Sequence, residues 1–393
     1  MTLALLSIAL VGGAARLCMP VLFKEISTDL NLDLVAVGTV WGMDSLAGFF
    51  ISIPGGLLMD RFGIRKSMVA VCILASVISA SRAFSGDFTG IAATTFAYGM
   101  VAVLVLIMAP KIAAAHFRGQ YLGLVNSLIF VSQYLGQMFA TMVSATLLSP
   151  LLGGWRNVFL LYSVPPLILL VFWWASREKN VEPERHKKME TPAGLKDSLL
   201  HVVKIKEVWL LGLLFFSQVG TLMSVNGYLP LYLRNLGWDA AAADGALTLT
   251  VAASCIGTIP IAHLSDRFKS AKVVLLSSVG IMSVVTALLF VAGGSFAVWI
   301  LMAVFGLLRG VPGVLGNSLI IETRGIDSKY VGTAIGITVS VGMIGGFILP
   351  PVGNSLASIH PALPFVFWAA ACLLFPAGVF FIKEPRRAGA KAA

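Results

Sequence analysis

The stretch "GGLLMDRFGIRKS", residues 55–67, decides the fold, because a second version of it, "IAHLSDRFKSAKV", occupies residues 261–273. In both, Asp-Arg-Phe comes at the end of a long apolar segment. Each version follows the second of a set of six apolar segments. Self-similarity between distant parts of a chain indicates a repeated unit. The sequence therefore predicts two copies of a six-segment unit.

The composition places this unit in a membrane. Of the 393 residues, 58% are hydrophobic and only 12% are charged, and the mean hydropathy is +0.91. A soluble chain of this length needs more charge to cover its surface. A helix that crosses the bilayer core, which is about 30 Å thick, needs about 20 apolar residues. Twelve stretches meet this requirement: residues 2–23, 34–58, 67–86, 88–110, 119–147, 155–175, 208–230, 240–263, 272–293, 296–321, 330–357 and 362–382.

Continuous hydrophobicity at these lengths predicts helices, because the strands of a membrane barrel alternate over about 10 residues. The predicted fold class is an all-α integral membrane protein with twelve transmembrane helices in two pseudo-symmetric six-helix bundles. Residues 1–175 are expected to form the first bundle and residues 208–393 the second. Residues 176–207 are charged, and we expect a cytoplasmic linker there, with a short amphipathic helix from about 195 to 203.

Lysine and arginine predict the orientation, because cytoplasmic loops carry an excess of both. If the N-terminus is cytoplasmic, the outer side carries only Lys24, Arg82, Arg156 and Arg234. The cytoplasmic side then carries the linker and Arg61, Arg65, Lys66, Lys111, Arg118, Arg267, Lys269, Lys272, Arg324, Lys329, Lys383, Arg386, Arg387 and Lys391. We therefore expect a multi-pass protein of the cell membrane with both termini cytoplasmic. This asymmetry explains the net charge of +10 without a nucleic-acid partner.

The cysteines and the missing nucleotide motif restrict the chemistry. Cys18, Cys72, Cys255 and Cys372 lie far apart in apolar segments, so neither a disulfide framework nor a metal site is expected. We find no P-loop, and we expect no cofactor and no ATP drive. A polytopic enzyme is disfavoured because the five histidines are scattered. The expected partners are the lipid bilayer and a small molecule, and we expect a monomer.

The first repeated stretch carries a specific motif, Gly-x-Leu-x-Asp-Arg-x-Gly-x-Arg-Lys, formed by Gly56, Leu58, Asp60, Arg61, Gly63, Arg65 and Lys66. The second keeps Asp266 and Arg267 but has Lys269 in place of the glycine. Together with "GGWRNVFLLY" (153–162) and the helix count, the sequence resembles the major facilitator superfamily. The resemblance implies that Asp60 and Arg61 latch the cytoplasmic gate. Independently, Gly56 permits close helix contact, Gly63 permits a tight turn, and the basic residues suit the anionic inner leaflet.

Three charges lie at membrane depth away from the ends of the predicted helices: Arg16, Asp44 and Arg309. Each costs roughly 2.5–3.5 kcal/mol at a helix centre, so such residues are functional candidates. Arg82 lies near the outer end of the third segment, and we expect it to reach the interface. "RGVPGVLGN", residues 309–317, is expected to let the tenth helix flex.

The resemblance implies that the first, fourth, seventh and tenth helices line a central cavity. Arg16 and Arg309 then face it from opposite halves, and a guanidinium is best matched by a carboxylate or similar oxyanion. Asp44 either pairs permanently with Arg16 or binds and releases a coupled proton. The sequence leaves both alternatives open. Weaker substrate-binding candidates are Tyr98, Gln218, Asn226 and Asn317, although buried amides also hold helices together.

These observations predict a secondary active transporter that moves a small organic or inorganic anion by alternating access. The energy would come from a coupled proton or a counter-anion. The alternative is an exporter of amphipathic or drug-like compounds. Two absences argue against a typical proton-driven exporter. Residues 93–104 lack the arginine that usually opens the fourth helix of this family. Residues 127–144 also lack the Gly-Pro pair of the exporter branches.

Overall fold

The computed structural model describes residues 2–116, 121–176, 195–268, 270–321, 323, 326–327 and 330–381. Twelve helices in it are long and apolar enough to cross a membrane. The described residues contain no strand. The all-α prediction with twelve spans is therefore confirmed.

The first six spans form what we call the N-half, residues 2–176. The first span joins three elements, and the fifth ends in a π-helical turn and a short helix. The elements are α1 (Thr2–Ser7), η1 (Ile8–Ala14), α2 (Ala15–Asp29), α3 (Leu34–Phe62), α4 (Ile64–Ala83), α5 (Phe88–His116), α6 (Tyr121–Val143), η2 (Ser144–Leu148), α7 (Ser149–Leu152) and α8 (Trp155–Ala175).

The remaining spans form the C-half, residues 195–381. The predicted surface helix precedes them as α9 (Leu195–Val202), which confirms that prediction. The other elements are α10 (Lys206–Asn235), α11 (Ala240–Phe268), α12 (Ala271–Ala292), α13 (Ala297–Leu308), α14 (Val311–Ile321), α15 (Val331–Ser355), η3 (Leu356–Ser358), α16 (Leu363–Leu374) and η4 (Phe375–Phe381). Most of the predicted linker, residues 177–194, lies outside the described residues.

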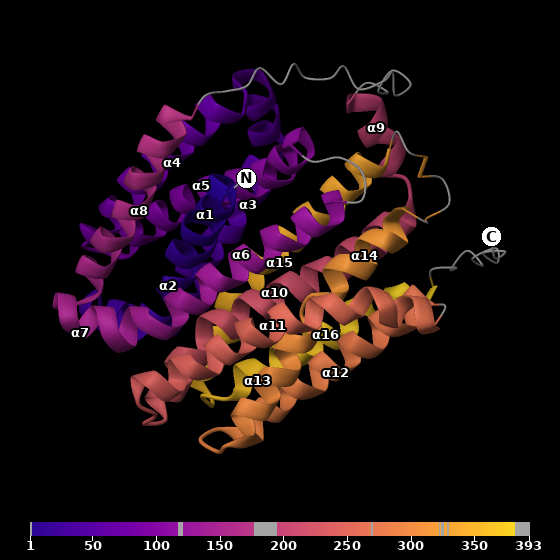
Figure 1. The fold of residues 1–393 in the computed structure, drawn as a ribbon. Coiled ribbons are helices and arrows are strands. Elements are labelled where there is room, and N and C mark those ends of the chain that lie inside the picture. Colours follow the sequence, from indigo (N-terminus) through magenta and orange to yellow (C-terminus); the bar gives the residue numbers. More distant parts are fainter. Residues whose placement is uncertain are drawn as a thin grey trace.

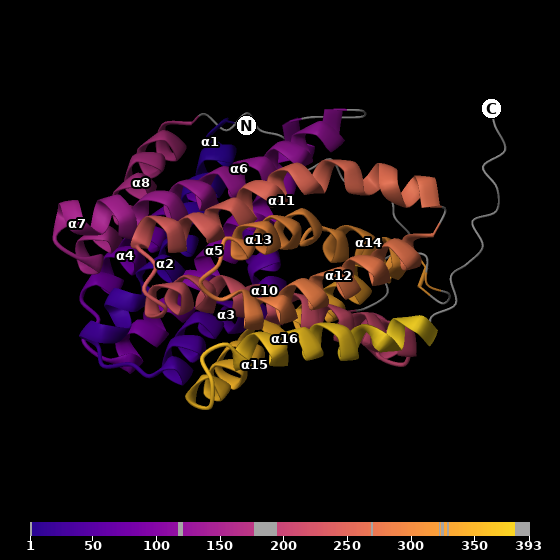
Figure 2. The ribbon, with the colours of Figure 1, turned by 90° about the horizontal axis from the view of Figure 1, so that it is seen from below.

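The two halves lie side by side (Figures 1 and 2). Each has its own core of buried apolar side chains. The N-half core also takes in Met223, Leu231, Leu247 and Val251 of the C-half, which marks where the halves meet. We call the end at which α8 ends and α10 begins the linker end, and the opposite end the far end.

Small residues let the halves approach closely. The most extensive contacts between them join α3 to α15 and α6 to α11. On α3, Gly38 and Gly42 have the small-xxx-small spacing of close membrane helices. A Cβ added at Gly42 would lie 2.8 Å from the carbonyl oxygen of Phe347. On α15, a Cβ at Gly346 would lie 2.4 Å from Oγ of Ser45. Glycine at these positions therefore sets the distance between the halves.

Within the N-half, η1 packs just as tightly on α6. A Cβ at Gly136 would lie 1.8 Å from the carbonyl oxygen of Ala9. We predict that Gly136→Ala lowers stability by about 1–3 kcal/mol, because backbone atoms would have to move apart. Thermal melting in detergent measures this. Gly280→Ala is the matched control, since a Cβ there meets nothing within 4 Å; equal melting of both variants would contradict the tight η1–α6 contact.

Candidate functional site

The tenth span breaks at Arg309. Helix α13 ends at Leu308 and α14 begins at Val311. The N–H of Arg309 still donates to the carbonyl of Phe305 (3.0 Å), but Pro312 has no N–H to continue the ladder. The predicted flexible point is therefore a break in the helix, and Arg309 lies on it.

The Arg309 side chain reaches from the C-half to the N-half. Its guanidinium carbon lies 5.5 Å from the ring centroid of Tyr134 on α6. Its Nη1 atom is buried and has no hydrogen-bond partner among the described residues. Arg16 of the N-half lies within electrostatic range and repels it. Arg309 thus presents an unused, charged donor where the two halves meet.

Arg16 is paired with Asp44. The Oδ2 atom of Asp44 accepts hydrogen bonds from Nε of Arg16 (2.8 Å) and from its Nη2. Asp44 is 1% exposed and Arg16 is 16% exposed. The Oδ1 atom of Asp44 is buried without a partner. The two side chains are paired in this conformation, so Arg16 does not face the interface as an uncompensated cation. The proton-coupling role of Asp44 stays a prediction.

Arg82 does not reach the interface, so that expectation was wrong. Its side chain is 1% exposed and turns into the N-half. The guanidinium carbon lies 4.1 Å from the ring centroid of Tyr98 and 5.4 Å from that of Phe159. Nη1 donates to the carbonyl of Ala15 (3.2 Å), while Nε has no partner among the described residues. Aromatic faces and a carbonyl compensate the charge in place of headgroups.

The π-helical segment η1 helps to build this cluster. Its backbone hydrogen bonds join residues five apart in the sequence, as in the bond from the N–H of Ala15 to the carbonyl of Leu10. The carbonyl of Val11 accepts a hydrogen bond from the Tyr98 hydroxyl (2.9 Å). Such bulges often occur at functional sites. Arg16, Asp44, Arg82 and Tyr98 thus form one buried group, contributed by α2, α3, α4 and α5.

The other predicted binding residues are dispersed. Tyr98 is fully buried and belongs to the cluster just described. Gln218 turns into the C-half, where its Nε2 lies 3.2 Å from Sγ of Cys372, which fits a role in holding helices together. Asn226 on α10 is 3% exposed, and Asn317 on α14 is half-buried. The Oδ1 atoms of both are buried without a partner. Among the described residues, none of these four makes a hydrogen bond to Arg309, so their substrate-binding role stays a prediction.

Hydrogen bonds join the halves near the far end. Nε1 of Trp41 donates to the carbonyl of Met223 (2.7 Å), linking α3 to α10. Nδ2 of Asn354 donates to the carbonyl of Leu34 (2.7 Å), linking α15 to α3. The hydroxyls of Thr248 and Thr141 lie 2.9 Å apart and link α11 to α6. These contacts hold the far end closed.

A buried ion pair supports the far-end closure. Nη2 of Arg234 lies 2.5 Å from Oδ2 of Asp244, and the two side chains are 9% and 1% exposed. Thr146, in η2 of the N-half, donates to the same oxygen (3.2 Å). Both charges lie near helix ends, which is why the sequence did not single them out.

Part of the predicted gating motif can be described at the linker end. Gly63 has φ +78°, a conformation that favours glycine, and it ends α3 by donating to the carbonyl of Met59 (3.0 Å). Arg65 donates through Nη2 to the carbonyl of Trp174.

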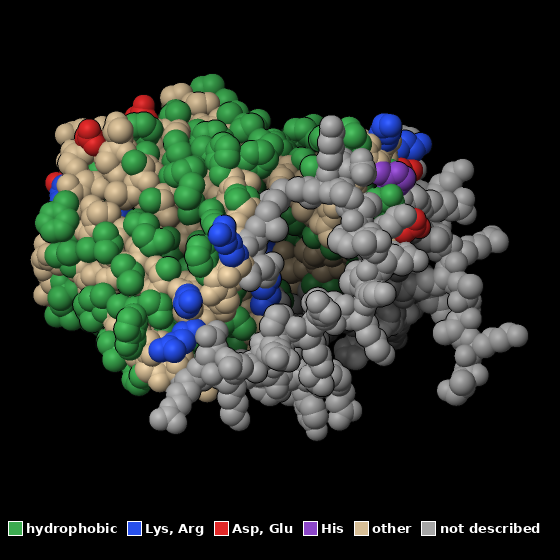
Figure 3. Space-filling model, turned by 90° about the horizontal axis from the view of Figure 1, so that it is seen from above, with side chains coloured by type: hydrophobic (Ala, Val, Ile, Leu, Met, Phe, Trp, Pro, Cys, Tyr) green, Lys and Arg blue, Asp and Glu red, His purple; other side chains and the backbone are tan. Residues whose placement is uncertain are grey.

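The other residues of the motif make no described latch contact. Arg61 and Lys66 are exposed. The surroundings of Gly56 and the side chains of Asp60, Asp266 and Arg267 lie outside what the structure describes, so the latch stays a prediction. Lys and Arg side chains gather on the face in Figure 3.

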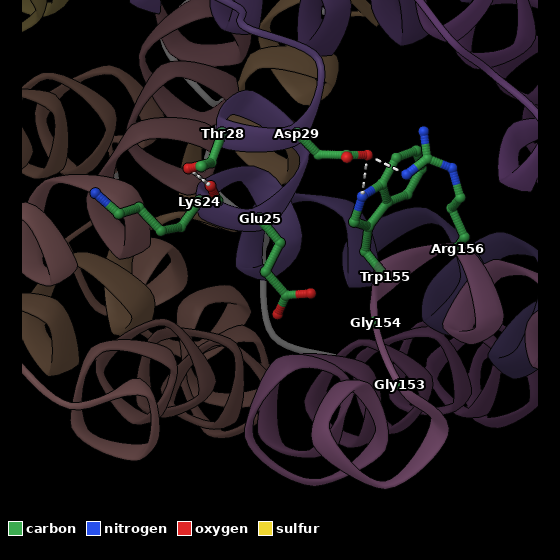
Figure 4. Close-up of a pocket in the computed structure, with 8 residues that line it drawn as sticks. All are labelled: Lys24, Glu25, Thr28, Asp29, Gly153, Gly154, Trp155 and Arg156. Atoms are coloured by element: carbon green, nitrogen blue, oxygen red, sulfur yellow. Dashed lines mark hydrogen bonds and ion pairs between the residues drawn. The ribbon is translucent and has the colours of Figure 1, made fainter.

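A surface cavity of about 530 Å³ lies at the far end, where α2 meets the turn before α8 (Figure 4). Asp29 accepts a hydrogen bond from Nε1 of Trp155 (3.1 Å) and pairs with Arg156. Gly153 and Gly154, both with positive φ, make the turn. The Asp29–Arg156 pair is about two-fifths exposed, at 43% and 40%. The "GGWR" stretch thus builds a solvated corner, remote along the helices from Arg309.

Comparison with known proteins agrees with this architecture. The family model of the Major Facilitator Superfamily matches residues 4–350 and 234–393. The chain belongs to the major facilitator superfamily. It is therefore a multi-pass membrane transporter of small molecules and not an enzyme.

Relatives of this superfamily member cover nearly the whole chain. It is 24% identical over 397 residues to the 3-(3-hydroxy-phenyl)propionate transporter of Escherichia coli (strain K12), covering 97% of this chain and 92% of that protein. It is 25% identical to the nitrite extrusion protein of Bacillus subtilis (strain 168), covering 92% and 87%. A bacterial homolog of the human lysosomal transporter Spinster, solved inward-facing and unoccupied, has the same fold: TM-score 0.77, 14% identity, 96% and 94% coverage.

The two ion pairs near the far end differ in burial, which gives a matched test. Asp244→Asn leaves Arg234 buried without its carboxylate, and we predict a loss of about 3–5 kcal/mol. Asp29→Asn breaks an exposed pair and is expected to cost at most about 1 kcal/mol. Thermal melts in detergent compare the two variants. Equal losses would show that the Asp244 pair is hydrated and not buried.

Proposed function

We propose that this transporter moves a small carboxylate-like anion across the cell membrane by alternating access, as a monomer with both termini cytoplasmic. Transport is coupled to a proton or to a counter-anion. The observation that carries the proposal is the buried, unpartnered Nη1 of Arg309 at the break between α13 and α14. A charged donor without a partner is costly at this depth, and a bound anion relieves that cost.

Arg309 is the primary anchor and Arg16 the second. Arg309 makes no ion pair with a described carboxylate, whereas Arg16 shares Asp44. The mutual repulsion of the two arginines weakens when an anion lies between them. A guanidinium presents a planar fork of donors that fits a carboxylate. The ring of Tyr134, beside Arg309, offers an apolar face to the body of the substrate.

The relatives support an anionic substrate. The propionate of one and the nitrite of the other carry one negative charge at neutral pH. One unpaired arginine at the centre suits a monoanion better than a dianion. Tyr98 and Gln218 are engaged in other hydrogen bonds, whereas Asn226 and Asn317, with Oδ1 atoms buried without a partner among the described residues, stay predicted substrate contacts.

Two observations support an inward-facing state. The far-end contacts close one side. On the opposite side, Lys and Arg side chains gather on the face in Figure 3, as expected of a cytoplasmic face. Transport then requires the far-end hydrogen bonds to break as the halves rock.

Uptake into proteoliposomes tests the anchor. With radiolabelled aromatic and aliphatic monocarboxylates and nitrite, Arg309→Gln is expected to lower uptake about 10- to 100-fold, because one charged hydrogen-bonding partner is lost. Arg309→Lys should retain part of the activity. Arg156→Gln, a far-end surface change, is the control. Unchanged anion uptake by Arg309→Gln contradicts the anchor, and uptake of amphipathic cations but of no anion supports an exporter.

The same assay tests the coupling ion. An imposed pH gradient that accelerates uptake identifies proton coupling.

Cross-linking tests alternating access. The Thr141 and Thr248 hydroxyls lie 2.9 Å apart across the far end. We predict that Thr141→Cys/Thr248→Cys forms a disulfide on oxidation, abolishes uptake, and recovers activity on reduction. Each single variant is the control. Full activity of the oxidised, cross-linked protein would contradict opening at this end.

A further inference from the structure

We propose that Arg82 is a positioning residue, the resident counter-ion of Asp44, which lets Arg16 exchange the Asp44 carboxylate for the substrate anion. The exchange rests on the proposed anion transport, whereas the Arg82–Asp44 coupling does not. Nothing in the sequence distinguished Arg82 from a side chain that reaches the interface.

Arg82 is placed to act on Asp44 and not on solvent. It is 1% exposed, lies over the Tyr98 ring at 4.1 Å and donates to the carbonyl of Ala15, the residue before Arg16. Its Nε is unpartnered among the described residues. Asp44 lies within electrostatic range of it, although the two side chains form no ion pair in this conformation. Ring faces and a carbonyl hold the guanidinium without neutralising it, so its charge remains available to a neighbour.

Asp44 has the matching free acceptor. Oδ2 takes both hydrogen bonds from Arg16, while Oδ1 is buried without a partner. Helix α5 packs directly on α3 at this level, since a Cβ at Gly99 would lie 2.8 Å from the Asp44 carbonyl oxygen. Arg82 contacts Tyr98 and Ala15, the residues that directly precede Gly99 and Arg16, and those two residues contact Asp44.

The exposed fractions of the three charged side chains indicate which of them binds the substrate. Arg16 is 16% exposed, whereas Asp44 and Arg82 are 1% exposed. Arg16 is therefore the most exposed charged member of the cluster, and Asp44 and Arg82 are buried. If Arg16 alone balanced Asp44, its departure would leave a buried, uncompensated carboxylate, which is strongly unfavourable. Arg82 removes that obstacle, because Asp44 keeps a counter-ion while Arg16 binds the anion.

The first arm of the test measures coupling without substrate. Melting temperatures in detergent are compared for wild type, Arg82→Gln, Asp44→Asn and the double variant. We expect the double variant to lose less than the sum of the singles. The matched cycle of Asp44→Asn with Arg156→Gln should be additive. Additivity in the Arg82 cycle would overturn the counter-ion assignment, and Arg82→Met, which removes the charge and keeps a long stem, replaces Arg82→Gln if the latter does not fold.

The second arm measures transport of the best monocarboxylate. In Arg82→Gln, Arg16 keeps its ion pair with Asp44 and is less available to the substrate. We therefore expect KM to rise about 10-fold, with Vmax per folded protein little changed. Asp44→Asn/Arg82→Gln frees Arg16 and should return KM to the wild-type value or below. A KM that does not recover in the double variant would overturn the exchange. Absence of anion transport in wild type would refute the proposed function and leave the first arm standing.

Discussion

A charge held at membrane depth must be compensated by the protein itself, and much of this structure follows from that requirement. Asp44 pairs with Arg16, while Arg82 is surrounded by two aromatic rings and a carbonyl. Arg309 differs from these, because its guanidinium pairs with no carboxylate or carbonyl among the described residues and its Nη1 is buried. Hydrocarbon supplies no substitute partner. Three of the charges meet this requirement through neighbouring groups of the protein, and for the fourth we propose the substrate anion.

Irregular helices supply the compensation. A carbonyl oxygen has two lone pairs, so a helix carbonyl can accept from a neighbouring side chain as well as from its own helix. In the first span, the π-helical η1 leaves the Val11 carbonyl for Tyr98, and Ala15 just beyond it accepts from Arg82. In the tenth span, the break places Arg309 between two shorter helices. Departures from regularity thus coincide with the charged residues in both halves.

The sequence was enough for the fold, because helix length and apolar continuity are local properties. The sixth span was predicted at 155–175 and observed as Trp155–Ala175. The structure places Asp44 and Nη1 of Arg309 in the interior, in agreement with the expected depth, while the functional roles of Arg16, Asp44 and Arg309 stay predictions. Side-chain direction was not predictable. Arg82 is one residue from the end of α4, and its stem is long enough to point either way. The approach of Tyr134 to Arg309 depends on how the halves pack, which no local pattern encodes.

The π-helical segment of the first span has a consequence for register. A π-bulge is equivalent to one residue inserted into an α-helix, and one residue corresponds to about 100° of rotation around the helix axis. Residues before η1 and residues after it therefore face directions that a continuous α-helix would not combine. The direction of Arg16 is set by this extra residue as well as by its own position. A relative that had lost one residue between 8 and 14 would keep the same arginine and turn it away from Asp44.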